Sequence, residues 1–165
     1  MDVLTVENLS VSFYRPEGEI EAVKNVSFSL REGEILAIMG ETGCGKSVLC
    51  KSILKLLPDI AKRKTGHIYV RGEEITDYSE KQMQKLRGSF FSMVFQNPMT
   101  ALHPCMSVGE QITEAVRLRQ PKLTKKERLQ KAAELMELVG LDHPAERAKQ
   151  YPAQLSGGMA QRCVI

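Results

Sequence analysis

Eight residues near the N-terminus have the composition of a phosphate-binding loop. The segment GETGCGKS at 40–47 places Gly40, Gly45, Lys46 and Ser47 at the spacing G-x-x-x-x-G-K-[ST]. Glycines let the backbone turn tightly, so that successive N–H groups point into one concavity at the start of a helix. The lysine can then reach the β- and γ-phosphates of a nucleotide, and the serine hydroxyl can bind Mg²⁺. The spacing predicts a nucleotide phosphate site.

A second glycine-rich segment, LSGGMAQR at 155–162, could also contact a phosphate. Ser156 stands where the N-cap of a helix would be, and Gly157 and Gly158 follow it. Two glycines weaken a helix, but they leave bare N–H groups and a hydroxyl at its positive end. Taken alone, the segment fits a plain loop before a helix at least as well.

The first loop needs a strand before it and a helix after it, and the sequence predicts both. The short apolar run ILAIM at 35–39 is typical of a buried strand. The segment 47–57 has apolar residues at helical spacing and ends at Pro58. A chance glycine turn would not require these neighbours.

The remaining pattern predicts a strand-rich part followed by a helical part. Alternation predicts strands over 3–13, with a slip around Asn8, and over 22–30, and two further candidates are HIYV at 67–70 and FFSMVF at 90–95. From Gln96 onward the pattern becomes helical. Ser107 and Glu110 form a capping box before one predicted helix, and Thr124 and Glu127 form another before a second. Gly140 ends this second helix, and Pro144 opens a short third one.

Three segments in order resemble the ATP-binding subunits of ABC transporters. GETGCGKS, VFQNP at 94–98 and LSGGMAQR look like the Walker A motif, the Q-loop and the ABC signature of that family. The segments QNPMTALHP and YPAQLSGGMAQR are similar to the subfamily that serves oligopeptide, dipeptide and nickel permeases. The resemblance implies an α/β fold: a P-loop NTPase core with an N-terminal antiparallel β region at 1–96, and a helical subdomain with the signature at 97–165.

The resemblance also implies roles for particular residues, with ATP and Mg²⁺ as cofactors. The Walker A loop would hold the phosphates through Gly40, Glu41, Thr42, Gly43, Cys44, Gly45, Lys46 and Ser47. Ser156, Gly157 and Gly158 would contact the γ-phosphate bound by a second ATPase subunit in a head-to-tail dimer. Ser47 and Gln96 would lie near the metal, with Gln96 also near the attacking water, although a polar residue ending a strand would look the same.

An aromatic residue near the N-terminus usually stacks on adenine in this family. We expect Tyr14 in that role, although the family position could equally fall on Phe13 or Arg15. An aromatic residue of the core or of a turn would give the same pattern. The assignment of the adenine contact therefore stays open at this point.

The family's Walker B Asp, catalytic Glu and switch His match nothing in these residues. We therefore expect a chain truncated before Walker B that binds ATP but hydrolyses it poorly. The family's activity would be ATP hydrolysis coupled to uptake of peptides or nickel-type cargo, and the alternative is a non-hydrolysing nucleotide-binding fragment or regulatory module. The next stretch of the reading frame would discriminate between these two.

Composition limits the setting and the partners. The formal net charge of +3 is too small to indicate nucleic acid, and no apolar run is long enough to cross a bilayer. Cysteines at 44, 50, 105 and 163 show no C-x-x-C spacing, which favours free thiols in a reducing compartment. The resemblance to ABC transporter subunits implies a peripheral protein on the cytoplasmic face of the membrane, bound to permease subunits and indirectly to an extracytoplasmic substrate-binding protein.

Overall fold

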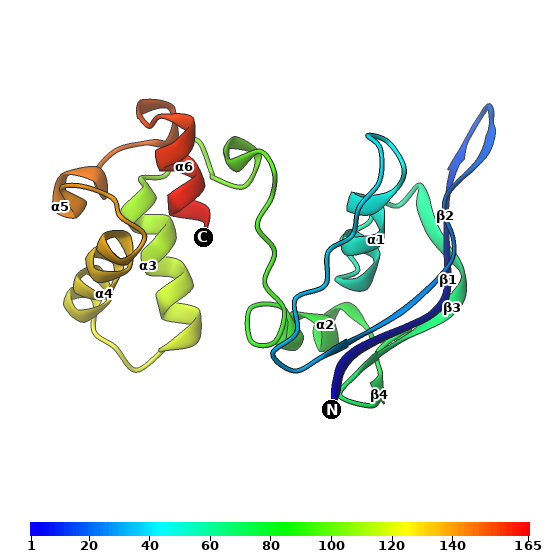
Figure 1. The fold of residues 1–165 in the computed structure, drawn as a ribbon. Helices are drawn as coiled ribbons and strands as arrows, with labels where there is room; N and C mark the ends of the chain where they lie inside the picture. The colour runs from blue at the N-terminus through cyan, green and yellow to red at the C-terminus, as the bar shows by residue number, and fades with distance from the viewer. The chain divides into compact units, whose positions relative to one another are not determined.

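The computed structural model describes residues 1–165 and divides them into two units, Met1–Phe91 and Ser92–Ile165. The first unit contains all the strands and helices α1 and α2, while the second is helical (Figure 1). The order of elements follows the predicted change from strands to helices. Each unit has its own apolar core, so each is described by itself.

One antiparallel sheet organises the first unit. Its strands are β1 (Asp2–Arg15), β2 (Gly18–Arg31), β3 (Ala61–Val70) and β4 (Glu73–Glu74), in the order β2-β1-β3-β4. Every neighbouring pair in the sheet runs antiparallel. The strands predicted over 3–13, 22–30 and 67–70 are confirmed, and each is longer than its apolar pattern indicated.

The slip predicted around Asn8 is a β-bulge. The pairing of β1 with β2 shifts register between Val6 and Leu9, and Asn8 has a φ of 50°. Gly66 of β3 lies opposite, where an added Cβ would be 2.5 Å from the Leu9 Cα. The bulge restores the alternation, so that Val6, Leu9 and Val11 are all buried.

Helix α1 (Lys46–Ile53) packs its buried residues Leu49 and Ile53 into the same core as β1. Its C-terminus is held by Arg87, which follows α2 (Glu80–Leu86). Arg87 donates to the carbonyl oxygens of Leu54 at 2.8 Å and Lys55 at 3.0 Å, two of the groups that a helix end leaves unpaired. The same guanidinium hydrogen-bonds Glu80 and thereby lowers the pKa of that carboxyl. The helix that follows the glycine loop is thus fixed at its far end.

Two predicted strands are wrong. Residues 35–39 pair with no strand, and the side chains of Ile35 and Met39 are 95% and 89% exposed. Residues 90–95 form only an isolated bridge between Phe91 and Arg87, and 92–95 are irregular. A strand needs a partner for its hydrogen-bond ladder, and the sheet of this structure contains only β1–β4.

The second unit is a cluster of short helices. They are η1 (Pro98–Thr100), α3 (Val108–Arg119), α4 (Lys125–Leu138), α5 (Pro144–Arg147), η2 (Pro152–Gln154) and α6 (Gly157–Val164). Both predicted capping boxes are confirmed, with Glu110 accepting from the Ser107 N–H at 2.9 Å and Glu127 from the Thr124 N–H at 2.7 Å. Residues from several of these helices share one core: Leu102, Val108, Met136, Leu141 and Ala160.

None of these helices combines the length and the apolar character that a membrane span requires.

Candidate functional site

The glycine loop has a backbone that only glycine can form at one key position. Gly45 is the N-cap of α1 with a φ of 94°, and no side chain caps the helix. A Cβ at Gly45 would lie 2.2 Å from the carbonyl oxygen of Ala22 in β2. The loop is therefore pressed against the sheet, and the first N–H groups of α1 are left for another acceptor.

Lys46 turns back across the loop that precedes it. Its Nζ donates to the carbonyl oxygens of Gly40 at 2.8 Å and Glu41 at 2.7 Å, and it lies 3.6 Å from the Cys44 Sγ. These bonds hold an ammonium group beside the unpaired N–H groups at the positive end of α1. The next side chain, Ser47, is exposed and its hydroxyl makes no hydrogen bond within the chain. An ammonium, free amides and a free hydroxyl suit a phosphate with its Mg²⁺.

A cavity of about 290 Å³ opens beside the loop. Its walls come from the β1–β2 hairpin on one side and from the loop and α1 on the other, and they are formed by Phe13, Arg15, Ile20, Ala22, Gly43, Gly45, Lys46, Ser47 and Val48. A concave space with one aromatic wall next to a phosphate cradle can take a flat base.

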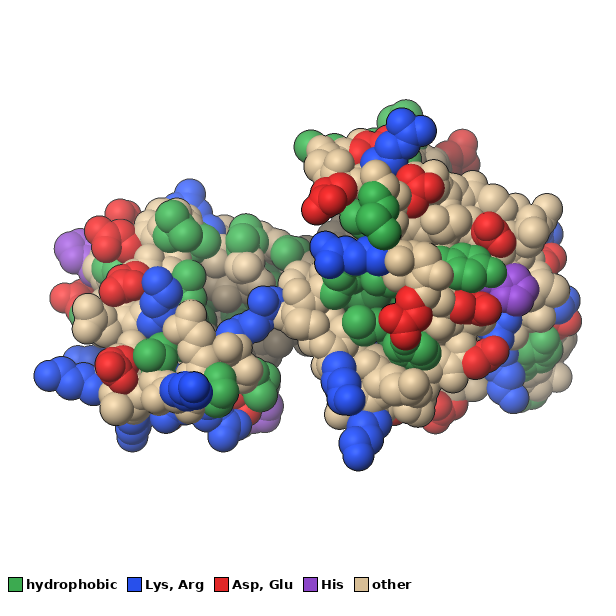
Figure 2. All heavy atoms as spheres, turned by 90° about the horizontal axis from the view of Figure 1, so that it is seen from below, with side chains coloured by type: hydrophobic (Ala, Val, Ile, Leu, Met, Phe, Trp, Pro, Cys, Tyr) green, Lys and Arg blue, Asp and Glu red, His purple; other side chains and the backbone are tan.

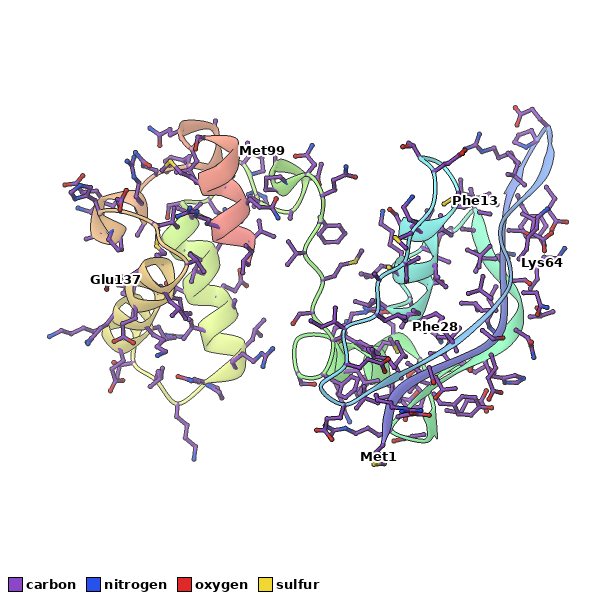
Figure 3. All side chains as sticks on the ribbon, viewed as in Figure 1. Met1, Phe13, Phe28, Lys64, Met99 and Glu137 are labelled. Atoms are coloured by element: carbon purple, nitrogen blue, oxygen red, sulfur yellow. The ribbon has the colours of Figure 1, made fainter.

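Tyr14 does not line this cavity. Its backbone N–H donates to the Ile60 carbonyl at 2.7 Å, and its side chain is exposed. Phe13 and Arg15, the two alternatives left open by the sequence, both line the cavity. Phe13 is labelled in Figure 3. Alternation could not have indicated this, because Val11 and Ser12 are both fully buried and the pairing of β1 with β2 shifts register between them.

A second cavity, of about 590 Å³, shares the loop as one wall. Its other walls include the charged Glu21 and Lys24 and several apolar residues, among them Val26 of β2, Leu49 of α1, and Ile38 and Met39 from the segment before the loop. The apolar residues that we predicted as a strand thus border an open space next to the phosphate cradle.

The second glycine segment begins α6 in the predicted way. Ser156 is the N-cap, and its Oγ accepts from the Met159 N–H at 3.3 Å. A Cβ added at Gly157 or at Gly158 would meet no atom within 4 Å, so nothing in this chain explains why they are glycine. Ala160, one turn further, is fully buried and anchors α6 to the core of the second unit. The glycine face of α6 is left open for an approaching group.

Gln96 lies in a bend just before η1, and it is exposed. It belongs to the second unit and makes no hydrogen bond there. The neighbouring Asn97 caps η1 by accepting from the Met99 N–H at 3.0 Å. No three His, Cys, Asp or Glu side chains gather closely enough to hold a metal ion by themselves.

The sequence is similar to known proteins along its length. The family model described as ABC transporter matches residues 23–165. The chain is 48% identical over 164 residues to the dipeptide transport ATP-binding protein DppD of Bacillus subtilis, covering 99% of this chain and 49% of that protein. It is 46% identical over 164 residues to the oligopeptide transport ATP-binding protein OppD of the same organism, covering 99% and 46%. The chain thus spans about half the length of the curated relatives it matches.

The fold is similar to solved ATP-binding cassettes. The dimeric, post-hydrolysis structure of the cassette MJ0796 bound to ADP and Pi aligns with a TM-score of 0.85 at 28% identity, covering 98% of this chain and 66% of that one. A second dimeric structure of MJ0796, described as a bacterial ABC transporter cassette, aligns with the same score and identity, covering 98% and 67%.

Proposed function

The chain belongs to the ABC transporter family, and we propose that it is the nucleotide-binding part of an ATPase subunit that drives the uptake of peptides. Its relatives DppD and OppD are named as dipeptide and oligopeptide transport ATP-binding proteins. These names favour peptides over the nickel-type cargo that the motifs would also fit.

The contacts of Lys46 are the main observation in favour of nucleotide binding. The ammonium lies 2.7–2.8 Å from two loop carbonyls, beside a helix start with no side-chain cap. We infer that residues 40–47 wrap the ATP phosphates and that Lys46 exchanges its carbonyl partners for phosphate oxygens. Ser47 would hold Mg²⁺ with Gln96, and the ion would neutralise charge that develops on the phosphates.

We propose that Phe13 stacks on the adenine base, in place of Tyr14. Phe13 borders the cavity that adjoins Ser47, and Tyr14 does not. An aromatic face with an arginine nearby, Arg15, gives a base a stacking surface and a cation.

We propose that the glycines of α6 meet a nucleotide held by a second subunit. Gly157 and Gly158 are open to the outside, and Ser156 adds a hydroxyl at the same helix end. A head-to-tail dimer would place this end against the phosphates on the partner. The subunit would then act on the cytoplasmic face of the membrane through permease subunits and, through them, with an extracytoplasmic substrate-binding protein.

The test is nucleotide binding with a matched pair of lysine variants. Charge-assisted bonds contribute about 1.5–3 kcal/mol each, so Lys46→Ala should lower ATP affinity at least about tenfold. Lys51→Ala removes a lysine from the last turn of the same helix and should leave the affinity unchanged. Calorimetry with Mg-ATP measures both. Equal affinity of Lys46→Ala and the unsubstituted chain would contradict the phosphate site.

A further inference from the structure

One end of the second unit concentrates positive charge. Helices α3 and α4 pack against each other and are joined by residues 120–124, so the last turn of α3 and the first turn of α4 lie at the same end of a helical hairpin. The cations there are Arg117, Arg119, Lys122, Lys125, Lys126 and Arg128. We call these residues the basic end. Figure 2 shows Lys and Arg side chains gathered along the edge of the second unit.

The charge of this segment differs from that of the rest of the chain. Residues 117–131 contain seven of the 23 Lys and Arg residues but only one of the 20 Asp and Glu residues. That segment has a formal charge of +6, in a chain whose total is +3, so the remaining residues are net acidic. The one acid, Glu127, already binds Thr124 in the capping box.

Most of these cations have no acidic partner. Arg117 contacts Glu114 at 3.7 Å, but no ion pair includes Arg119, Lys122, Lys125, Lys126 or Arg128. The Arg128 Nε is buried and has no hydrogen-bond acceptor in the chain. Four exposed side chains of the basic end are free for an outside anion: Arg119, Lys122, Lys125 and Lys126.

Helix stability does not explain the two lysines of α4. Cations at the end of α3 are favourable, because the C-terminus of a helix is negative. Lys125 and Lys126 instead occupy the first turn of α4, where they oppose the helix dipole and repel the nearby cations. Glu127 in the same turn and the Glu110 carboxylate, which attracts Lys125, offset part of this repulsion, and an external anion would offset more of it.

The apolar residues at this end indicate which anion. Leu118, between Arg117 and Arg119, is 75% exposed, and Leu129 is also exposed. No Phe, Tyr or Trp lies between 107 and 150, so bases have no stacking surface here. Exposed leucine among cations suits a bilayer surface, where the side chain enters the interface and the cations meet headgroups. We propose that the basic end binds the anionic headgroups of a lipid bilayer.

The experiment measures co-sedimentation of the whole chain with vesicles that contain about one-third phosphatidylglycerol in phosphatidylcholine, and with phosphatidylcholine alone. Binding should require phosphatidylglycerol and should weaken between about 0.05 and 0.5 M salt as charges are screened. The variant K122Q/K125Q/K126Q should bind roughly 100-fold more weakly, since each lysine near an anionic surface contributes about a factor of five.

A second triple variant is the matched control. K62Q/K81Q/K85Q removes the same charge from exposed lysines of the first unit, none of which forms an ion pair, and should keep wild-type binding. Leu118→Ser should weaken binding several-fold at the higher salt, where the apolar contact remains.

Three results would overturn the proposal. Equal losses in the two triple variants would do so, and so would equal binding to both kinds of vesicle. Binding of soluble polyglutamate or duplex RNA in preference to vesicles would also overturn it, because it would indicate an acidic protein or nucleic acid. The vesicle assay contains no nucleotide, so loss of lipid binding and loss of ATP binding can be observed separately.

Discussion

Helices α1 and α6 both have eight residues and both begin at glycine-rich segments, but their N-termini are built differently. At α1, Gly45 sits against the sheet, and no side chain caps the helix. At α6, Ser156 caps the helix, and a Cβ added at Gly157 or Gly158 would meet no atom within 4 Å. One segment contains a cation, Lys46, and the other contains none in its first turn.

This difference separates two reasons for a glycine. Gly45 is required by the chain itself, because any side chain would strike Ala22. Gly157 and Gly158 are not required by the chain, because a side chain at either position would meet no other atom. A missing side chain there matters only to a group that approaches from outside. We therefore expect the first loop to hold its shape through contacts within the chain, and the α6 glycines to act only on a group from outside it. Substitutions at the two sites should therefore have opposite effects on stability.

Gly45→Ala should have the largest effect. A positive φ and a 2.2 Å approach to backbone together should lower the free energy of unfolding by at least about 3 kcal/mol and abolish ATP binding. Thermal unfolding and calorimetry measure the two effects. Gly43→Ala is the matched control, because Gly43 also has a positive φ but no atom within 4 Å of an added Cβ. It should cost only about 1–2 kcal/mol. Equal losses in both variants would show that contact with the sheet is unimportant.

Gly158→Ala should have a smaller effect of opposite sign. Alanine in place of a helical glycine with open surroundings should raise the stability of the chain by about 0.5–1 kcal/mol. ATP affinity of the isolated chain should not change, because the phosphate loop lies in the other unit. Denaturant unfolding and calorimetry give the two values. A loss of stability greater than about 1 kcal/mol would mean that Gly158 has a role within its own chain.

Patterns that depend on nearby residues were predictable from the sequence. The two capping boxes, the N-cap at Ser156 and the slip in alternation around Asn8 are each set within a few residues, and each is confirmed. The family inferred from GETGCGKS, VFQNP and LSGGMAQR is also confirmed, and so is the cassette fold. The roles given to individual site residues stay predictions.

Features that depend on a distant partner were not predictable. The run at 35–39 has the composition of a strand, but only a neighbouring strand could make it one. Helix α2 was missed because it buries a single residue, Met83, and so shows no apolar periodicity. The clamp of Arg87 on Leu54 joins residues 33 positions apart, a contact that no local pattern encodes.

The two motif helices also differ in their cysteines, and this gives the smallest effect that we predict. Cys44 is exposed beside Lys46, in the loop that precedes α1, whereas Cys163 is half-buried near the end of α6. Burial raises the pKa of the Cys163 thiol, so less of it is thiolate near neutral pH and its reaction with a maleimide should be slow and should rise as pH increases. Cys44 should react faster than Cys163 and faster than the partly buried Cys50, with no change in stability. Mg-ATP should slow the labelling of Cys44 by covering the loop and should leave Cys163 unaffected.

Brief alkylation followed by peptide mapping, with and without Mg-ATP, measures all four cysteines in one sample. The exposed Cys105 serves as an internal standard because it lies outside the phosphate loop. If nucleotide slows Cys44 and Cys105 equally, or slows neither, Cys44 is an ordinary exposed thiol whose backbone alone contributes to the phosphate cradle.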